Sequence, residues 1–167
     1  MPTLTLINPG SNVAAALAHL TLLDHATVAT SSATETTMTG SGIDYTLTGT
    51  GFTTTVIGGE TYINSGTADR IDIAITGVAT YSYADLGVDG ARLRNLLLVD
   101  CAGTDNTALE RLFLALNWTI QGTSGVDQHT GAEISLDGIS LMPTGRNTCY
   151  FGDGADQVYG AGSGRRR

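Results

Sequence analysis

The chain has no lysine. All eight of its basic residues are arginines, and three of them, Arg165, Arg166 and Arg167, are consecutive. Because it also carries sixteen acidic residues, the formal net charge is −8. This charge argues against general nucleic-acid binding, which needs a cationic face to neutralise phosphates, and it opposes binding to anionic membranes. It is compatible with divalent cations and favours solubility.

Cysteines and targeting segments are also scarce. Cys101 and Cys149 permit one disulfide but do not require it, and two buried thiols are the default expectation. The first residues lack the positively charged region of a signal peptide. The apolar stretch at 13–23 contains His19 and is too short to span a membrane. Neither a cleaved export signal nor membrane insertion is expected.

Charged residues are few, at 14%, whereas hydrophobic residues make up 41% of the 167 residues. Enough apolar surface is therefore present to offset chain entropy, and the length suits one domain. Thr, Ser, Asn and Gly must supply much of the polar surface. Threonine is β-branched and suits strands, and the 22 glycines favour chain reversals. A mainly-β fold is therefore predicted.

The spacing of apolar residues also predicts strands. Apolar and polar residues alternate over 43–47, 71–75 and 134–136, and each run is followed by a glycine, namely Gly49, Gly77 or Gly138. This pattern indicates a sandwich-like or solenoid-like sheet with one buried face and tight corners. The intervals between the runs are unequal, so no internal repeat is predicted.

Two or three short helices accompany the strands. They are predicted over 11–23, 89–99 and 107–116. Ser11 or Asn12 can cap the first helix, and Asp89 can cap the second. In the third, Thr107 and Glu110 have the spacing of a capping box, in which each side chain accepts a hydrogen bond from a free backbone N–H.

The pattern divides the chain into three parts. They are an N-terminal helix with a Thr/Ser-rich arm at 1–42, a β-rich core domain at 43–150, and a Gly-rich tail with an arginine terminus at 151–167. Trp118 is expected to be a core or interface anchor. The three terminal arginines are expected to contact neighbouring subunits.

No group of residues has the pattern of a catalytic centre. The acidic residues are scattered among turns and strand ends, and neither zinc-ligand spacing nor a phosphate-binding loop is present. A small hydrolase using His129 and nearby carboxylates is the weakest option, because no nucleophile elbow accompanies that histidine. The chain is therefore predicted not to be an enzyme, with no catalytic or cofactor-binding residues.

The strongest motif is YFGDGADQVYGAGSG, near the end of the sequence. Gly152, Gly154 and Asp156 match one turn of the calcium-binding repeat G-G-x-G-x-D-x-U-x, in which U is a large apolar residue. Arg165 stands where the next turn needs an aspartate. One turn supplies few oxygen ligands, so Asp153 and Asp156 are predicted to be weak calcium ligands.

The stretch from about residue 45 to 160 resembles the region that precedes calcium repeats in bacterial RTX-type proteins. The motifs YTLTGTGF, GGETYI, IAITGVATYSYADL, TALERLFLALNW and FGDGADQVYGAGSG carry the resemblance. It implies export without a cleaved signal and a role as an extracellular enzyme, adhesin or surface-layer protein. The chain departs from that family in having one degenerate repeat and an arginine-rich ending.

The expected function is structural and non-enzymatic. Composition favours a homo-oligomeric subunit of a surface or particle assembly, such as a spike, decoration or tail component of a phage-like virion, involved in architecture or attachment. The expected location is a virion or an extracellular surface. The alternative is an RTX-like secreted module that binds calcium or a surface glycan.

Overall fold

The computed structural model describes residues 1–8, 12–77, 79–103, 105–130, 135–136, 139–141 and 143–159. Its helical segments are α1 (Val13–Thr21), the 3₁₀ helix η1 (Leu22–His25), α2 (Gly90–Cys101) and α3 (Ala108–Leu114). Its first seven strands are β1 (Thr3–Leu6), β2 (Thr27–Ser31), β3 (Glu35–Gly40), β4 (Ile43–Ile57), β5 (Glu60–Ile75), β6 (Ala79–Ala84) and β7 (Val88–Asp89). The later strands are β8 (Thr119–Gln121), β9 (Gln128–Thr130), β10 (Ser135–Leu136), β11 (Ile139–Ser140), β12 (Thr148–Tyr150) and β13 (Gln157–Tyr159).

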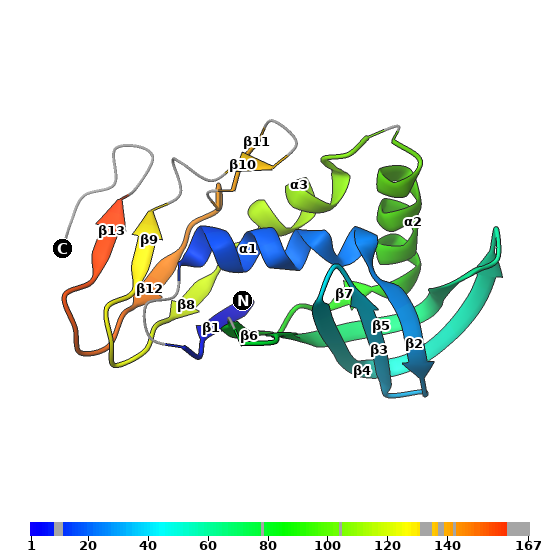
Figure 1. Cartoon of the computed structure of the whole chain (residues 1–167), viewed down its shortest axis with the longest axis horizontal. Helices are drawn as coiled ribbons and strands as arrows, with labels where there is room; N and C mark the ends of the chain where they lie inside the picture. Colours follow the sequence, from blue (N-terminus) through cyan, green and yellow to red (C-terminus); the bar gives the residue numbers. More distant parts are fainter. Residues whose placement is uncertain are drawn as a thin grey trace.

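Nine of these strands form one open mixed sheet, in the order β12-β8-β1-β6-β5-β4-β3-β2, with β7 paired to β5 (Figure 1). The strands from β1 to β2 in this order are antiparallel, whereas β8 and β12 run parallel to β1. Strands β9 and β13 form a separate parallel pair, and β10 and β11 form a short antiparallel pair. The expectation of a mainly-β chain with short helices is confirmed.

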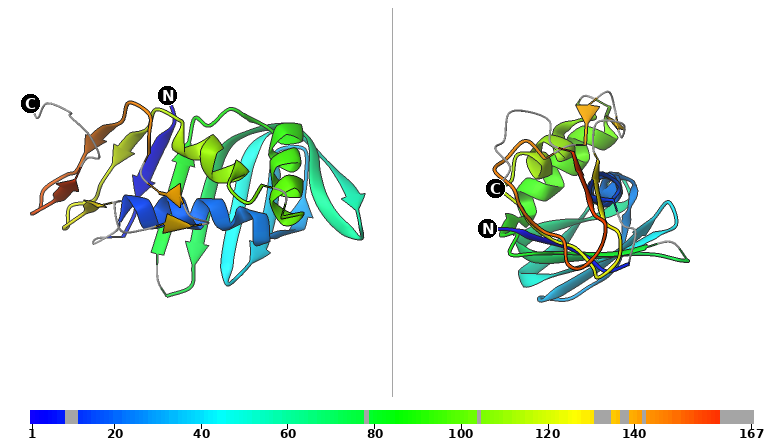
Figure 2. Two further views of the ribbon diagram at one scale, coloured as in Figure 1. Left: turned by 90° about the horizontal axis from the view of Figure 1, so that it is seen from above. Right: turned by 90° about the vertical axis from the view of Figure 1, so that its left-hand side faces the viewer.

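The helices cover one face of the large sheet, as the end-on view shows (Figure 2). Two buried tyrosines link the sheet to α1. Tyr45 Oη donates a hydrogen bond to the His19 carbonyl at 3.0 Å, and Tyr83 Oη donates to the Ala16 carbonyl at 2.7 Å. The opposite face is rich in threonine, and the Thr30 and Thr37 hydroxyls hydrogen-bond across it at 2.7 Å. One face is thus the core, and the other is polar.

The predicted alternation is confirmed over 43–47, where all three apolar side chains are buried, but the predicted corner at Gly49 is wrong. Strand β4 continues through Gly49, where its register with β5 shifts. A Cβ on Gly49 would lie 1.8 Å from the Thr67 carbonyl oxygen. The glycine therefore permits two backbones to approach closely within the sheet rather than ending the strand. Gly77 does lie in a turn, with φ of 72°.

Two of the three predicted helix caps are confirmed. The Asn12 side chain accepts from the Ala14 N–H at 2.8 Å, and Asp89 accepts from the Arg92 N–H at 2.7 Å. The capping box of α3 is wrong, because Thr107 makes no side-chain cap. Its hydroxyl donates instead to Asp105 at 2.9 Å, which draws it away from the helix N–H groups.

The hairpin formed by β4 and β5 extends beyond the rest of the sheet. The ladder between β3 and β4 ends at Thr48, and β6 pairs only with residues 71–75 of β5. Residues 53–57 and 60–65 therefore pair only with each other within the described part of the chain. The hairpin tip and the β9–β13 pair lie at opposite ends of the long axis (Figures 1 and 2).

Strands from all three predicted segments of the chain share this architecture. β1 from the first segment pairs with β6 and β8, and β13 from the last pairs with β9. The boundaries at residues 42 and 150 stay a prediction.

Within the described residues, no helix is long and apolar enough to cross a membrane. Cys149 carries a free, half-buried thiol, and burial raises its pKa.

Candidate functional site

The C-terminal part of the chain contains two stacked coils, each made of a strand, a turn and a second strand. The first runs from β8 to β9, and the second from β12 to β13. Thr148 aligns with Thr119 in one pair of strands, and Gln157 aligns with Gln128 in the other. Both offsets are 29 residues (148 minus 119, and 157 minus 128). Such constant spacing means that the second coil repeats the path of the first in register.

Residues at equivalent positions of the two coils are partly identical. The matching pairs are Thr119 with Thr148, Gly125 with Gly154, Asp127 with Asp156, and Gln128 with Gln157. The N-terminal strand continues the stack on the other side, since β1 is parallel to β8 and Asn12 forms a parallel bridge with Gln128. This end of the molecule therefore has the layered geometry of a short solenoid.

Asp127 holds the first turn together. Its side chain is fully buried, and Oδ2 accepts a hydrogen bond from the Thr123 N–H at 2.5 Å. The Thr123 hydroxyl also donates to this carboxylate, at 3.1 Å to Oδ1. The Asp127 N–H donates to Asp156 Oδ1 at 3.0 Å, and the Asp127 carbonyl accepts from the Gln157 N–H. Asp127 therefore connects its own turn to the next coil.

The two turns approach so closely that glycine is required at the contact. A Cβ on Gly154 would lie 2.5 Å from the Gly125 carbonyl oxygen, and one on Gly152 would lie 2.5 Å from the Thr123 carbonyl oxygen. Gly154 also has a φ of 153°, which side-chain-bearing residues rarely adopt. The glycines of the predicted calcium motif thus have a packing role in this stack.

The predicted calcium ligands lie on the second turn. Asp153 is exposed, and Asp156 is half-buried with Oδ1 accepting from the Asp127 N–H. Within the described residues, no group of three or more His, Cys, Asp or Glu side chains has an arrangement that could hold a metal ion. Calcium binding stays a prediction. Arg165, Arg166 and Arg167 lie outside the described residues, as does the side chain of His129.

Asp127 is the residue of this site whose role was not predicted from the sequence. A comparison of the segment 119–128 with 148–157 contains the signal, since both follow the pattern T-x-x-x-x-x-G-x-D-Q. Only one of these turns has enough glycine to match the calcium-repeat pattern. From sequence alone, the segment 119–128 therefore resembles an ordinary loop. Its equivalence to 148–157 becomes clear only from the pairing of the strands.

Trp118, expected to be a core or interface anchor, lies in the core of this subunit with none of its surface exposed. Its indole Nε1–H donates to the Phe113 carbonyl at 2.9 Å, and its ring meets Tyr83 edge-on with 6.1 Å between ring centroids. The Trp118 N–H donates to Asn147 Oδ1 at 2.9 Å. Trp118 thereby joins α3, the sheet and the loop before β12.

The stack ends on an unpaired strand edge in the described part of the chain. The Thr148 N–H donates to the Trp118 carbonyl, and the Tyr150 carbonyl accepts from the Gly122 N–H. Successive residues of a strand direct their peptide groups to opposite edges, so the N–H and C=O of Cys149 point away from β8. Tyr150, 64% exposed, lies beside them. Unpaired edges of this kind can accept another strand.

A cavity of about 510 Å³ lies at the other end of the molecule, between η1, α2 and the β4–β5 hairpin. Its titratable lining residues are Asp24, His25, Glu60, Tyr62 and Asp100. His25 Nε2 lies 3.5 Å from Asp24, and the Tyr62 hydroxyl donates to Glu60 at 2.7 Å. Among the described residues that line this cavity, none is a serine or a cysteine.

His19 lies away from this cavity, in the layer between α1 and the sheet. Its ring stacks on Tyr81 with 5.6 Å between centroids, and burial lowers its pKa. This histidine therefore contributes to packing.

Comparison of the chain with protein-family models, curated proteins and solved structures finds no match. The geometry of the coil stack and of the exposed surfaces is therefore the basis for inferring function.

Proposed function

We propose that this chain is a non-enzymatic structural subunit that self-associates into an oligomeric surface or particle assembly, such as a component of a phage-like virion. The unpaired edge of β12 carries the proposal. There the backbone of Cys149 faces outward beside the exposed Tyr150. An added strand would satisfy these peptide groups and cover the aromatic ring, so both main-chain hydrogen bonds and apolar burial favour association.

A lysine at position 150 is expected to weaken this association at least tenfold. Charged side chains, lysine above all, protect natural sheet edges because pairing with another strand would desolvate the charge. Tyr150→Lys therefore opposes strand addition without removing a buried side chain. The measurement is the molar mass in solution over a range of protein concentrations, by size-exclusion chromatography with light scattering.

Thr48→Lys is the matched control, because it adds the same charge to an exposed position on the interior strand β4. It is expected to associate like the unmodified chain. A chain that stays monomeric at every concentration would overturn the proposed function. Equal association of the Tyr150→Lys variant and the control would exclude the β12 edge as the contact.

A second candidate function is an RTX-like secreted module that binds calcium. The observation in its favour is that Asp127 and Asp156 occupy equivalent positions in stacked turns, since calcium in such rolls lies between turns. Asp153, exposed on the same turn as Asp156, supplies a further carboxylate. Surface glycans remain the other proposed ligand of this module.

Calcium at millimolar concentration is expected to raise the melting temperature if this second function is correct, because a ligand that binds only the folded state stabilises it. The double variant Asp153→Asn and Asp156→Asn should remove the increase, as measured by differential scanning calorimetry with magnesium as the comparison cation. An unchanged melting temperature in calcium would argue against the module. So would an increase that survives the double substitution.

A further inference from the structure

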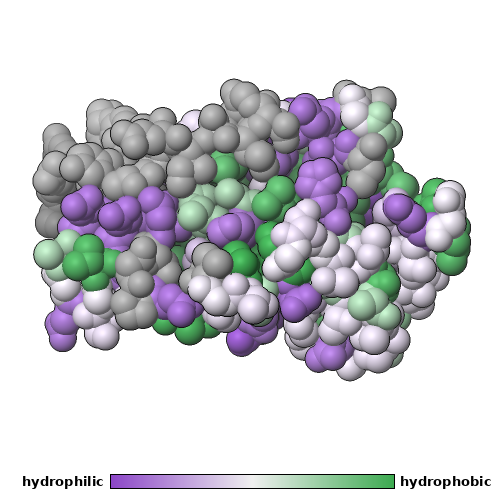
Figure 3. Space-filling view, in the orientation of Figure 1, coloured by the Kyte–Doolittle hydropathy of each residue, from purple (hydrophilic) through white to green (hydrophobic). Residues whose placement is uncertain are grey.

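The tip of the β4–β5 hairpin combines exposed apolar side chains with a carboxylate. Val56 is 67% exposed and Ile57 is 40% exposed. Gly58 and Gly59 form the two-residue turn, with φ of 63° and 93°, and Ile57 is paired directly across the ladder with Glu60. Figure 3 shows hydrophobic surface at this protruding end of the molecule. Ile57 and Glu60 therefore share one face of the tip, whereas Val56, one position earlier in the strand, lies on the opposite face.

The base of this hairpin is held firmly, unlike its tip. Ile63 is buried, and its side chain lies so close to α2 that a Cβ on Gly90 would be 3.0 Å from it. Arg94 Nη1 of the same helix donates to Asn64 Oδ1 at 2.5 Å. A two-stranded hairpin alone is marginally stable in water, so these contacts fix its direction and hold the tip outward.

A groove of about 370 Å³ lies between α2 and α3 and has the complementary character. Its lining residues are Arg92, Leu96 and Val99 of α2, Ala108, Arg111 and Leu112 of α3, and Asp105 before α3. The α2 residues follow helical spacing and share one face. Val99 of α2 is 38% exposed although its side chain is aliphatic. The groove therefore has an apolar floor with guanidinium groups beside it.

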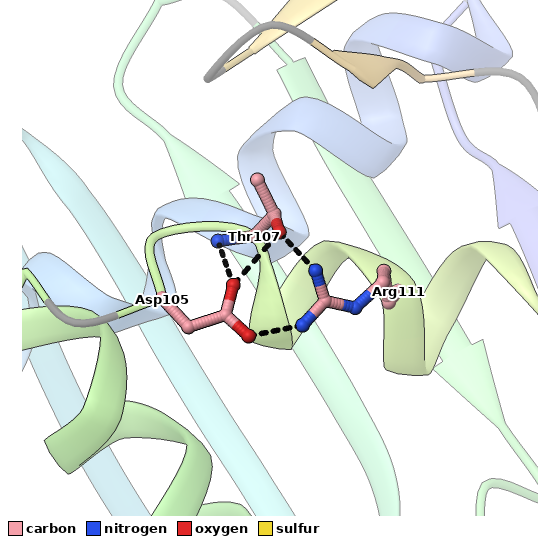
Figure 4. A network of polar contacts seen from close by, with 3 residues as sticks. All are labelled: Asp105, Thr107 and Arg111. Carbon is pink, nitrogen blue, oxygen red and sulfur yellow. Dashed lines mark hydrogen bonds and ion pairs between the residues drawn. The ribbon is translucent and has the colours of Figure 1, made fainter.

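Among the described residues, Arg111 has a carboxylate partner in this groove, whereas Arg92 has none. Arg111 bonds to both Asp105 and Thr107 (Figure 4). The pKa of Asp105 is lowered mainly by the hydrogen bond from Arg111 and next by the hydrogen bond from Thr107. Asp105 therefore stays ionised beside Arg111. The guanidinium of Arg92 makes no hydrogen bond or ion pair with a described residue, and the charge that the groove offers to a ligand is therefore positive.

We propose that the α2–α3 groove of one copy receives the β4–β5 hairpin tip of a second copy, with Glu60 of the tip facing Arg92 of the groove. Ile57, which shares a face of the hairpin with Glu60, would then pack on the apolar floor. The Tyr62 hydroxyl already bonds to Glu60 Oε2, which leaves Oε1 available for the guanidinium. This inference rests on the proposed self-association and adds a second contact to the β12 edge.

The contact joins two different surfaces, so it is heterologous. A row of subunits joined in this way would have a free tip at one end and a free groove at the other. Such contacts generate rings when the rotation closes and open filaments when it does not. A heterologous contact can therefore extend an assembly beyond two copies, whereas an isologous contact alone joins only two.

A charge exchange between two variants tests the contact directly. Arg92→Glu and Glu60→Arg each place like charges in every tip–groove pair, so each variant alone is expected to associate at least tenfold more weakly than the unmodified chain. In an equimolar mixture, every contact between unlike variants joins opposite charges again. Light scattering should therefore show association restored in the mixture to within a few-fold of the unmodified chain.

Arg70→Glu and Glu35→Arg, at exposed positions on the sheet, are the matched controls and should each associate normally on their own. Arg92→Gln and Glu60→Gln give a second test without charge reversal and should weaken association by a smaller factor. A mixture that associates no better than its components overturns the tip–groove contact. If the unmodified chain associates and the Tyr150→Lys variant associates more weakly, the proposed function survives the failure of the tip–groove contact. A wholly monomeric unmodified chain overturns both.

Discussion

Replacing Trp118 with alanine is expected to lower the free energy of unfolding by about 3–5 kcal/mol, the range measured for large aromatic side chains removed from protein cores. The side chain is fully buried and contacts Tyr83, while its Nε1–H satisfies the Phe113 carbonyl at the end of α3. The substitution would therefore leave a cavity where α3, the sheet and the coil stack meet. Domains have total stabilities of about 5–15 kcal/mol, so this loss is a large fraction of the whole.

Urea denaturation followed by circular dichroism measures this loss. Trp118→Phe is the graded variant, because it keeps an aromatic ring in the core but removes the hydrogen bond to Phe113. It is expected to cost clearly less than the alanine variant. Tyr150→Ala, which removes an exposed aromatic ring, should change stability by about 0.5 kcal/mol or less. If Trp118→Ala were as mild as Tyr150→Ala, the placement of Trp118 in the core would be wrong.

Replacing Asp127 with alanine is the second large effect, with an expected loss of about 2–3 kcal/mol. Hydrogen bonds to charged groups contribute about 1.5–3 kcal/mol, and a donor left buried without a partner costs about 1–3 kcal/mol. The variant would leave the Thr123 N–H and hydroxyl without their carboxylate. Both groups lie in the turn that contacts the second coil, so the stack should loosen at β9 and β13 first.

Hydrogen exchange of the amides in β9 and β13, together with calorimetric unfolding, measures this effect. Asp127→Asn retains one oxygen acceptor and is expected to lie between alanine and the unmodified chain. Asp153→Ala, at an exposed position of the next turn, should change stability by about 0.5 kcal/mol or less. Equal effects of Asp127→Ala and Asp153→Ala in the absence of calcium would contradict a structural role for Asp127.

Local sequence features predicted a good part of this fold. The alternation of Ile43, Tyr45 and Leu47 correctly indicated a strand with one buried face. Asn12 and Asp89 correctly indicated where two helices begin. These features succeed because strand alternation and helix capping depend on residues within a few positions of one another.

Other features of the molecule depend on residues that are far apart in the sequence, and these were not predicted. The equivalence of Asp127 and Asp156 follows from pairing β9 with β13 at a sequence separation of 29 (157 minus 128). Likewise, Gly49 is required by the approach of Thr67 from β5, which no pattern around Gly49 reveals. The groove of the further inference exists only because α2 and α3 lie side by side in the folded chain.

The sequence alone therefore determined the class of this protein: a mainly-β, acidic chain with short helices, two of which have the predicted caps. Tertiary structure decided which strands are neighbours, which turn buries Asp127, and which edge and hairpin tip remain exposed. The physical reason is that periodicity and capping are local properties of a chain. Strand register, close backbone contact and leftover surface depend on which remote segments meet when the chain closes on itself.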